Sequence, residues 1–462
     1  MQMIPHVTDA IQAWIMEVSR IAVGCNDDSA DICLIELGGT VGDIESAVYL
    51  EALQQFQYKV GIENVCMIHV GLVPVMGVVG EQKTKPCQHS VKLLREAGIR
   101  PDFLFCRSES ILDESVKSKL SLFCQTPESH VISLHDCSNT YRVPLLLHSQ
   151  RAGELVLSRL GLAPVGSTTP LSLIEWAAMA DRTDRTTGKV NIAVVGKYTG
   201  LSDSYLSIIK GLKHAGLESG LDVDIQWIAA TDLEKPTSAD ISSANSYRDA
   251  WARMKGCDGV LVPGGFGDRG VEGKILASRF CRENNIPYFG ICLGLQTAVI
   301  SFARDVLGLA DANSAEFDTK TENQVVIFMP EVSQTTMGGT MRLGVRNTAI
   351  RHDTLASKLY GGRSTVSERH RHRYEVNPLY VENLEKAGMI FSGVDKDRME
   401  IAEIPSLRFF IACQFHPEFT SRPRDPNPLF LGFVLAAANI LDRRLADDGG
   451  LLSVGSGWNK TL

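Results

Sequence analysis

A cysteine between two glycines is the feature of this sequence best suited to chemistry. Cys292 ends an apolar run that starts at Tyr288, with Gly290 two residues before it and Gly294 two residues after it. Such a run predicts a β-strand that turns sharply into a helix, because glycine permits backbone angles and close approaches that a Cβ forbids. The helix N-terminus would then face the sulfur and favour its thiolate form. Taken alone, the segment fits a nucleophile and a buried structural thiol equally well.

Two further segments carry the groups that a cysteine nucleophile needs. His416 follows another apolar run, and Glu418 lies two residues beyond it. An imidazole can exchange a proton with the sulfur, and a carboxylate can hold that imidazole in one tautomer. A third apolar run ends at Val262 and leads into Gly264 and Gly265, where exposed backbone N–H groups can bind an oxyanion. The three segments together favour a catalytic cysteine.

The order and spacing of these segments resemble those of the triad-type, or class I, glutamine amidotransferases, from about Asn191 to Arg443. In that family the cysteine attacks the side-chain amide of glutamine and releases ammonia. The resemblance implies that Cys292 is the nucleophile, His416 the general acid and base, and Glu418 the acid that orients the imidazole.

The same resemblance implies the residues that contact glutamine. Glu316 matches an acid that pairs with the α-ammonium group, and Arg373 matches a residue that recognises glutamine at the lid. The run from Arg369 to Arg373 alternates arginine and histidine, which alone would suit phosphate or nucleic acid, but the acidic net charge and the family resemblance together favour a loop on the substrate side. The implied oxyanion and glutamine-binding residues are Gly265, Leu293, Gly294, Leu295, Gln296, Glu316 and Arg373.

Length and composition limit the class of protein. A chain of 462 residues is too long for one core and predicts two or three domains. The net charge of −8 argues against a general nucleic-acid binder. The longest apolar stretch, near 430–441, is too short to span a bilayer, and the first residues lack a signal-peptide pattern. Eleven cysteines without a C-x-x-C pair indicate reduced thiols in a cytoplasmic protein, and no cluster of Cys and His predicts a metal site.

Two blocks of sequence alternate short apolar runs with helical stretches, which is typical of parallel α/β sheets. In residues 1–160 the expected strands are Asp31–Leu37, Val65–Val70, Phe103–Cys106 and Val131–Leu134, with helices at Gln88–Ala97 and Asp113–Leu122. Residues 161–189 are expected to form a linker with one short helix around Leu171–Ala180.

The second block, residues 190–445, opens on another apolar run. Its expected strands are Val190–Gly196, Val223–Ile228, Gly259–Val262 and Tyr288–Ile291, with helices at Tyr205–Ala215 and Lys274–Glu283. Residues 446–462 are rich in glycine and serine, and they are expected to be a disordered tail.

The first block contains two segments suited to nucleotides. Glu36 stands at the end of an apolar run, and the glycine-rich loop after it carries Asp43 and Glu45, which suits Mg²⁺ and phosphate oxygens. Further on, Lys83 and Lys85 precede a helix start, where ammonium and backbone N–H groups can surround phosphate. On spacing alone, a loop of solvated acids and a solvated basic turn are the simpler interpretations.

Together, the strings IELGGTVGDIES and KTKPCQHS resemble the nucleotide-site motifs of the CTP synthase family, and the resemblance extends from near Met1 to about Arg443. In that family ATP phosphorylates the uracil oxygen of UTP, and ammonia from glutamine displaces the phosphate. The resemblance implies a partial P-loop-type or Rossmann-like synthetase domain followed by a flavodoxin-like class I amidotransferase domain. It places Mg²⁺ at Glu36 and the ATP adenine near Arg107. The residues implied to bind UTP, or CTP as feedback inhibitor, are Asp43, Ile44, Glu45, Ser46, Lys83, Thr84, Lys85, Pro86, Cys87, Gln88 and Lys119.

The resemblance also implies glutamine, UTP and ATP as substrates, GTP as an allosteric activator and a homotetramer, with no nucleic-acid or membrane partner. The family's phosphate loop, G-x-x-x-x-G-K-[ST], does not occur in the sequence. Its absence predicts an N-terminally truncated chain whose glutaminase half is more complete than its synthetase half. The alternatives are a stand-alone glutaminase, another amidotransferase, or a non-catalytic assembly or regulatory subunit.

Overall fold

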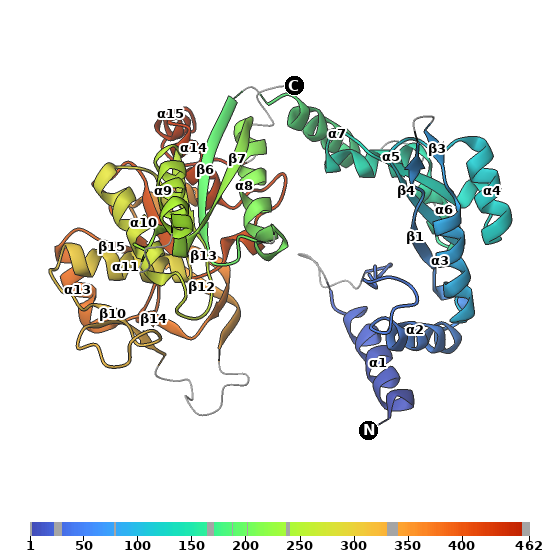
Figure 1. The fold of residues 1–462 in the computed structure, drawn as a ribbon, viewed down its shortest axis with the longest axis horizontal. Helices are drawn as coiled ribbons and strands as arrows, with labels where there is room; N and C mark the ends of the chain where they lie inside the picture. The colour runs from blue at the N-terminus through green and yellow to red at the C-terminus, as the bar shows by residue number, and fades with distance from the viewer. Residues whose placement is uncertain are drawn as a thin grey trace. The chain divides into compact units, whose positions relative to one another are not determined.

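A computed structural model of the chain describes residues 2–22, 30–77, 80–163, 171–186, 188–200, 202–236, 241–329 and 341–454. The chain divides into two compact units, Met1–Asp184 and Arg185–Leu462 (Figure 1). Each unit has its own sheet and its own buried apolar clusters. The predicted fold class, two α/β units with parallel strands, is confirmed.

The first unit is built on a three-stranded parallel sheet in the order β1-β4-β5. The strands β4 and β5 are buried along most of their length because helices cover the apolar side chains. The strands are β1 (Ile68–Leu72), β2 (Val75–Met76), β3 (Glu81–Gln82), β4 (Phe103–Ser108) and β5 (Val131–His135). The α-helices are α1 (Thr8–Val18), α2 (Ala47–Val60), α3 (Lys85–Glu96), α4 (Glu114–Cys124), α5 (Val143–Ser149), α6 (Ala152–Arg159) and α7 (Leu171–Asp184).

The strand expected at Asp31–Leu37 is wrong. These residues form no strand, and the side chains of Leu34 and Ile35 are 90% and 50% exposed. A strand needs a neighbour for its backbone N–H and C=O groups, and the described sheet of the first unit pairs β1 with β4 only. The apolar run identified a segment suited to a sheet, but it carried no information about a pairing partner.

The expected linker is largely helical, and its helix belongs to the first unit. Arg142 holds α7 through Asp181, at 2.8 Å, and through Asp184, at 2.5 Å. The indole Nε1 of Trp176 donates to the carbonyl of Tyr141 at 2.6 Å. Residues 164–170 and 187 of the expected linker lie outside the described residues.

The second unit contains a nine-stranded sheet in the order β13-β12-β15-β16-β17-β9-β8-β6-β7. Its parallel part, β17-β9-β8-β6-β7, is covered on one face by α8 and α14 and on the other by α9, α10 and α11, as Figure 1 shows. Burial on both faces explains why its central strands read as continuous apolar runs. The four strands expected in this unit coincide with β6 to β9.

The remaining bounds of the second unit complete the fold. The strands are β6 (Gly188–Gly196), β7 (Leu221–Ala229), β8 (Gly259–Val262), β9 (Tyr288–Ile291), β10 (Asn313–Ser314), β11 (Gln324–Phe328), β12 (Arg342–Ile350), β13 (Thr365–His372), β14 (Tyr374–Val376), β15 (Ile390–Asp395), β16 (Arg398–Glu403) and β17 (Phe410–Cys413). The α-helices are α8 (Leu206–Ser219), α9 (Ile241–Lys255), α10 (Val271–Asn284), α11 (Leu293–Asp305), α12 (Leu355–Leu359), α13 (Pro378–Lys386), α14 (Pro428–Ala437) and α15 (Leu441–Asp447).

The tail expected to be disordered from residue 446 is ordered at its start. Helix α15 runs to Asp447, and Leu452 is buried in the core while its N–H donates to the Lys358 carbonyl at 2.8 Å. One apolar side chain among glycines anchors this part, and residues 455–462 lie outside the described residues. No helix in the described part of the chain has the length and apolarity needed to cross a bilayer.

Candidate active site

The nucleophile turn has the predicted geometry. Cys292 follows β9 and caps α11 with φ 54° and ψ −101°, a conformation that side chains rarely adopt and that marks functional turns. Its N–H donates to the Cys413 carbonyl at 2.7 Å, and its carbonyl accepts from Leu295 N at 3.0 Å. A Cβ on Gly294 would lie 2.1 Å from the Val262 carbonyl oxygen, so only glycine lets α11 approach β8 this closely.

The histidine and the carboxylate meet the cysteine at the carboxyl end of β17. The N–H of His416 donates to the Arg369 carbonyl at 2.8 Å, and its Nδ1 lies 2.7 Å from Glu418 Oε1. This leaves Nε2 for the cysteine, and the two side chains are hydrogen-bonded. A Cβ on Gly264 would lie 3.1 Å from the His416 ring and 3.4 Å from Cys292 Cβ, so this glycine leaves room for both.

The electrostatics of this trio favour a protonated imidazole. Burial by itself lowers the pKa of His416, but the charges of Glu418 and Cys292, with hydrogen bonds to both, raise that pKa well above its ordinary value. The imidazole therefore holds its proton between a carboxylate and the sulfur. This is the protonation state from which a cysteine nucleophile reacts.

Gly265 and Leu293 lie next to each other at the nucleophile turn. Leu293 opens α11, so its N–H has no partner within the helix. A Cβ on Gly265 would lie 3.8 Å from the Leu293 side chain, which places the two residues next to each other. The arrangement fits the predicted oxyanion hole.

The predicted glutamine residues Glu316 and Arg373 lie within electrostatic range of each other. Glu316 Oε1 accepts from Gly267 N at 3.4 Å. Burial raises the pKa of Glu316, while the Gly267 N–H and the cations Lys197 and Arg373 oppose the rise. A partly buried carboxyl group beside two cations is suited to recognising both charged groups of an amino acid.

Two other predicted glutamine residues are engaged inside the protein. The Leu295 side chain is fully buried in the apolar core, so only its backbone can face a substrate. Gln296 is 3% exposed, and its Nε2 donates to the Tyr374 carbonyl at 3.1 Å and to Gln414 Oε1 at 3.2 Å.

Two lysines near the site were not predicted from the sequence. Lys197, after β6, donates from Nζ to the carbonyls of Phe266 and Gly267, beside the glycine turn. Lys274 is fully buried and donates from Nζ to the Pro263 carbonyl at 2.6 Å. Burial lowers its pKa to about 7, assisted by Lys197 and opposed by Cys292. Its place in the apolar stripe of α10 was the available signal, because a lysine there must be buried.

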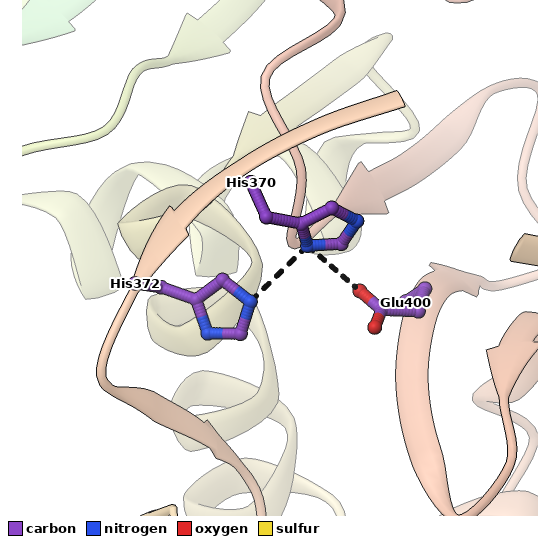
Figure 2. Close-up of side chains that lie close together, drawn as sticks. All are labelled: His370, His372 and Glu400. Atoms are coloured by element: carbon purple, nitrogen blue, oxygen red, sulfur yellow. Dashed lines mark hydrogen bonds and ion pairs between the residues drawn. The ribbon is translucent and has the colours of Figure 1, made fainter. Parts of the chain in front are cut away.

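A buried polar cluster lies on β13 and β16. Figure 2 shows the imidazoles of His370 and His372 and the carboxylate of Glu400 facing one another, and within the described residues this is the group whose ligand atoms are close enough for a metal ion. Arg342 Nη2, however, already lies 2.9 Å from Glu400 Oε1. Because this guanidinium supplies the positive charge that the carboxylate needs, we assign the cluster to an ion-paired interior rather than to a metal.

In the first unit, Glu36 and the glycine loop line one pocket. The pocket collects Glu36, Asp43, Glu45 and Ser46, and Ser46 Oγ donates to the carbonyls of Thr40 and Asp43. Ile44 is 91% exposed and points away from the core. Glu36 sits on an exposed loop rather than at a strand end.

The basic segment lies at the start of α3. Lys83 pairs with Glu81 at 2.6 Å, and Lys119 on α4 also acts on that carboxylate. Gln88 Nε2 donates to Thr84 Oγ1 at 3.0 Å, and the helix begins at Lys85 with Pro86 in its first turn.

Two predicted nucleotide residues have partners inside the first unit. The Cys87 thiol is fully buried in the core, so only the backbone of this residue can contact a nucleotide. Arg107 donates to the Leu134 carbonyl at 2.6 Å and pairs with Asp136 at 2.7 Å, at the carboxyl edge of the sheet where α/β folds bind ligands.

A thiol at a strand-to-helix turn, paired with a histidine and a glutamate on a five-stranded parallel sheet, defines a class I glutamine amidotransferase unit. The family model "Glutamine amidotransferase class-I" matches residues 201–436, and "CTP synthase N-terminus" matches residues 1–162. The glutaminase domain of Trypanosoma brucei CTPS, solved with bound acivicin, is 45% identical with a TM-score of 0.50, and the match covers 54% of this chain and 94% of that one.

Full-length relatives extend the match to both units. CTP synthase of Dictyostelium discoideum is 49% identical over 96% of this chain and 80% of its own length. CTP synthase 1 of Saccharomyces cerevisiae is 49% identical over 95% of this chain and 78% of its own length. The chain belongs to the CTP synthase family. Matches across both units favour this family over a stand-alone glutaminase or another amidotransferase.

Proposed function

We propose that this chain carries out the ATP-dependent amination of UTP to CTP with ammonia released from glutamine. The observation that carries the proposal is the hydrogen-bonded arrangement of Cys292, His416 and Glu418 in the same chain as a CTP synthase N-terminal unit. The catalytic trio would release ammonia from glutamine, and the N-terminal unit would use that ammonia to aminate UTP.

In the first half-reaction the Cys292 thiolate attacks the side-chain carbonyl carbon of glutamine. The carbonyl electron pair moves to oxygen, where the N–H groups of Gly265 and Leu293 stabilise the charge. The C–N bond then breaks as His416 gives its proton to the leaving nitrogen, which departs as ammonia and leaves a thioester.

In the second half-reaction water attacks the thioester, and neutral His416 takes a proton from it. The C–S bond breaks, glutamate leaves, and the thiolate and imidazolium are restored. Glu418 keeps the imidazole in one tautomer through both halves, since its Oε1 holds Nδ1 at 2.7 Å. Glu316 and Arg373 are proposed to bind the α-ammonium and carboxylate ends of glutamine.

The test compares two buried thiols of the same unit. Cys292→Ala should abolish release of glutamate from glutamine, whereas Cys413→Ala should retain it, because Cys413 packs in the core and bonds the Phe415 carbonyl. Both proteins should melt at similar temperatures. Hydrolysis that survives in Cys292→Ala refutes the nucleophile assignment.

Glu36, Asp43 and Glu45 line one pocket of the first unit together with apolar side chains such as Trp14 and Ile35. Mg²⁺ takes one or two carboxylates together with phosphate oxygens, so a single carboxylate of this pocket is enough in donor chemistry. Glu36 is proposed to hold the ion, which would neutralise phosphate charge when bound. Arg107 is proposed to lie near the ATP adenine.

The start of α3 is proposed to bind the phosphates of UTP, or of CTP as feedback inhibitor. Lys83, Lys85 and Lys119 supply charge, and the first N–H groups of α3 supply donors. In isothermal titration with UTP, Lys85→Ala should weaken binding about tenfold or more, since one charge-assisted bond is lost. Lys92→Ala, an exposed lysine on the same helix, is the matched control. Equal affinities for both variants would place the phosphates elsewhere.

We further propose the other properties that the family resemblance implies. These are activation by GTP as an allosteric effector, a homotetrameric assembly and a cytoplasmic location, without nucleic-acid or membrane partners. The acidic net charge of −8 supports the absence of nucleic acid. Gel filtration with and without UTP and ATP tests the tetramer, and glutamate release with and without GTP tests the activation.

A further inference from the structure

A second side chain, besides that of His416, reaches the sulfur of Cys292. Gln414 follows β17, is 1% exposed, and lies with its Nε2 at 3.6 Å from Cys292 Sγ. Its backbone N–H donates to the Glu400 carbonyl at 2.8 Å, which fixes the residue between β16 and the catalytic turn. No motif in the sequence marks this residue as functional.

The orientation of the Gln414 amide is fixed by its neighbours. The Tyr374 carbonyl can only accept, so the Gln296 amide must turn its NH₂ group toward Tyr374 O, at 3.1 Å. The same NH₂ group lies 3.2 Å from the Gln414 amide and therefore requires the oxygen of Gln414 on that side. The Gln414 NH₂ group is then left facing the sulfur.

The Tyr374 carbonyl, which begins this series of hydrogen bonds, is itself held in place. His372 Nδ1 lies 3.0 Å from Tyr374 O and is the N–H donor to it. Its Nε2 lies 3.2 Å from His370 Nδ1, and that nitrogen also faces Glu400 at 3.6 Å, as Figure 2 shows. The buried cluster of His370, His372 and Glu400 thus holds the Tyr374 carbonyl in place. The orientation of the two glutamine amides follows from the position of this acceptor.

We propose that Gln414 is a further catalytic residue, which donates an N–H to the sulfur of Cys292 and stabilises it as thiolate, and that Gln296 is its positioning residue. The inference rests on the proposed role of Cys292 as nucleophile. The thiolate then lies between two donors, the imidazolium of His416 and the amide of Gln414. No proton moves from the amide, so its contribution is the hydrogen bond alone, which is stronger to the ion than to the neutral thiol.

The test replaces Gln414 by methionine, which keeps the length of the side chain and removes the donor. Loss of one hydrogen bond to an ion should lower kcat/KM for glutamine hydrolysis about tenfold to a hundredfold. The midpoint of the pH profile for iodoacetamide labelling of Cys292, followed by mass spectrometry of its peptide, should move upward by about one pH unit. A merely structural role would not move this midpoint.

The matched control is Asn377→Ala, which removes another buried amide, bonded to the Gln324 carbonyl and to Leu379 N. It should lower the melting temperature without moving the labelling profile. If Gln414→Met does not fold, Gln414→Asn carries the same test, because its amide is too short to reach the sulfur. An unchanged labelling midpoint in a folded variant refutes the inference. Failure of the proposed function is distinct, since glutamine hydrolysis would then survive in Cys292→Ala.

Discussion

The most direct perturbation of the catalytic trio is Glu418→Gln, which keeps the shape of the side chain and removes its charge. In the native protein the carboxylate lies 2.7 Å from His416 Nδ1 and, with Cys292, raises the pKa of the imidazole against the effect of burial. In the variant His416 is still buried, while the carboxylate charge of Glu418, which most strongly raises its pKa, is gone. The pKa of His416 should therefore fall.

The size of the effect follows from the lost interaction. A hydrogen bond to a charged partner contributes about 1.5–3 kcal/mol. Two unit charges about 4 Å apart near a protein surface interact by about 4 kcal/mol, which sets an upper limit. A loss of about 2–4 kcal/mol in transition-state stabilisation corresponds to a fall in kcat/KM of about 30-fold to 1,000-fold.

The assay is glutamate release as a function of pH. Ammonia leaves only when the imidazole is protonated, so a lower pKa should move the alkaline limb of kcat/KM to lower pH. Glu403→Gln is the control, because Glu403 is also buried but bonds the N–H groups of Leu355 and Ala356 instead. An alkaline limb that stays in place in Glu418→Gln, with activity reduced less than about threefold, refutes the assigned role.

Three further predictions concern buried groups. Lys274→Met should raise or preserve the melting temperature, since a desolvated ammonium is lost. It should also lower kcat for glutamine hydrolysis about tenfold, because the Pro263 carbonyl beside the glycine turn loses its donor. An unchanged kcat would contradict this prediction. Burial lowers the pKa of His372 to about 3, so the folded protein must lose stability as pH falls below about 6.5, where the unfolded chain binds this proton. At pH 5 the difference is about 2 kcal/mol, and the melting temperature of His372→Gln should fall less between pH 7 and pH 5 than that of the native protein; equal falls would contradict the depressed pKa. Gly294→Ala should give little folded, active protein in circular dichroism and glutaminase assays, because its Cβ would lie 2.1 Å from the Val262 carbonyl; normal activity would show that the turn can yield.

The catalytic turns and the central strands that carry them could be predicted from the sequence. The runs ending at Val262 and Ile291 are buried on both faces, so their apolar character is local and continuous. Cys292, His416 and Glu418 stand directly after such runs, and carboxyl ends of parallel strands meet at one edge of a sheet. Their proximity therefore followed from pattern and topology.

Which polar residues are buried, and which groups they bond, could not be predicted from the sequence, because both depend on how distant segments pack. Strand β13 alternates exposed arginine with buried Glu368, His370 and His372, a polar pattern that hydrophobic periodicity does not detect. At Asp31–Leu37 the apolar pattern predicted a strand that the structure does not contain, because a strand also needs a pairing partner.

The same limit applies to the residues around the sulfur. The partners of the Gln414 side chain, Gln296 and Cys292, come from a segment far away in the chain, and burial of a polar group is tolerated only where such partners meet it. Local spacing encodes an element and its apolar face. The satisfaction of a buried donor or acceptor depends on contacts that exist only after the chain has folded.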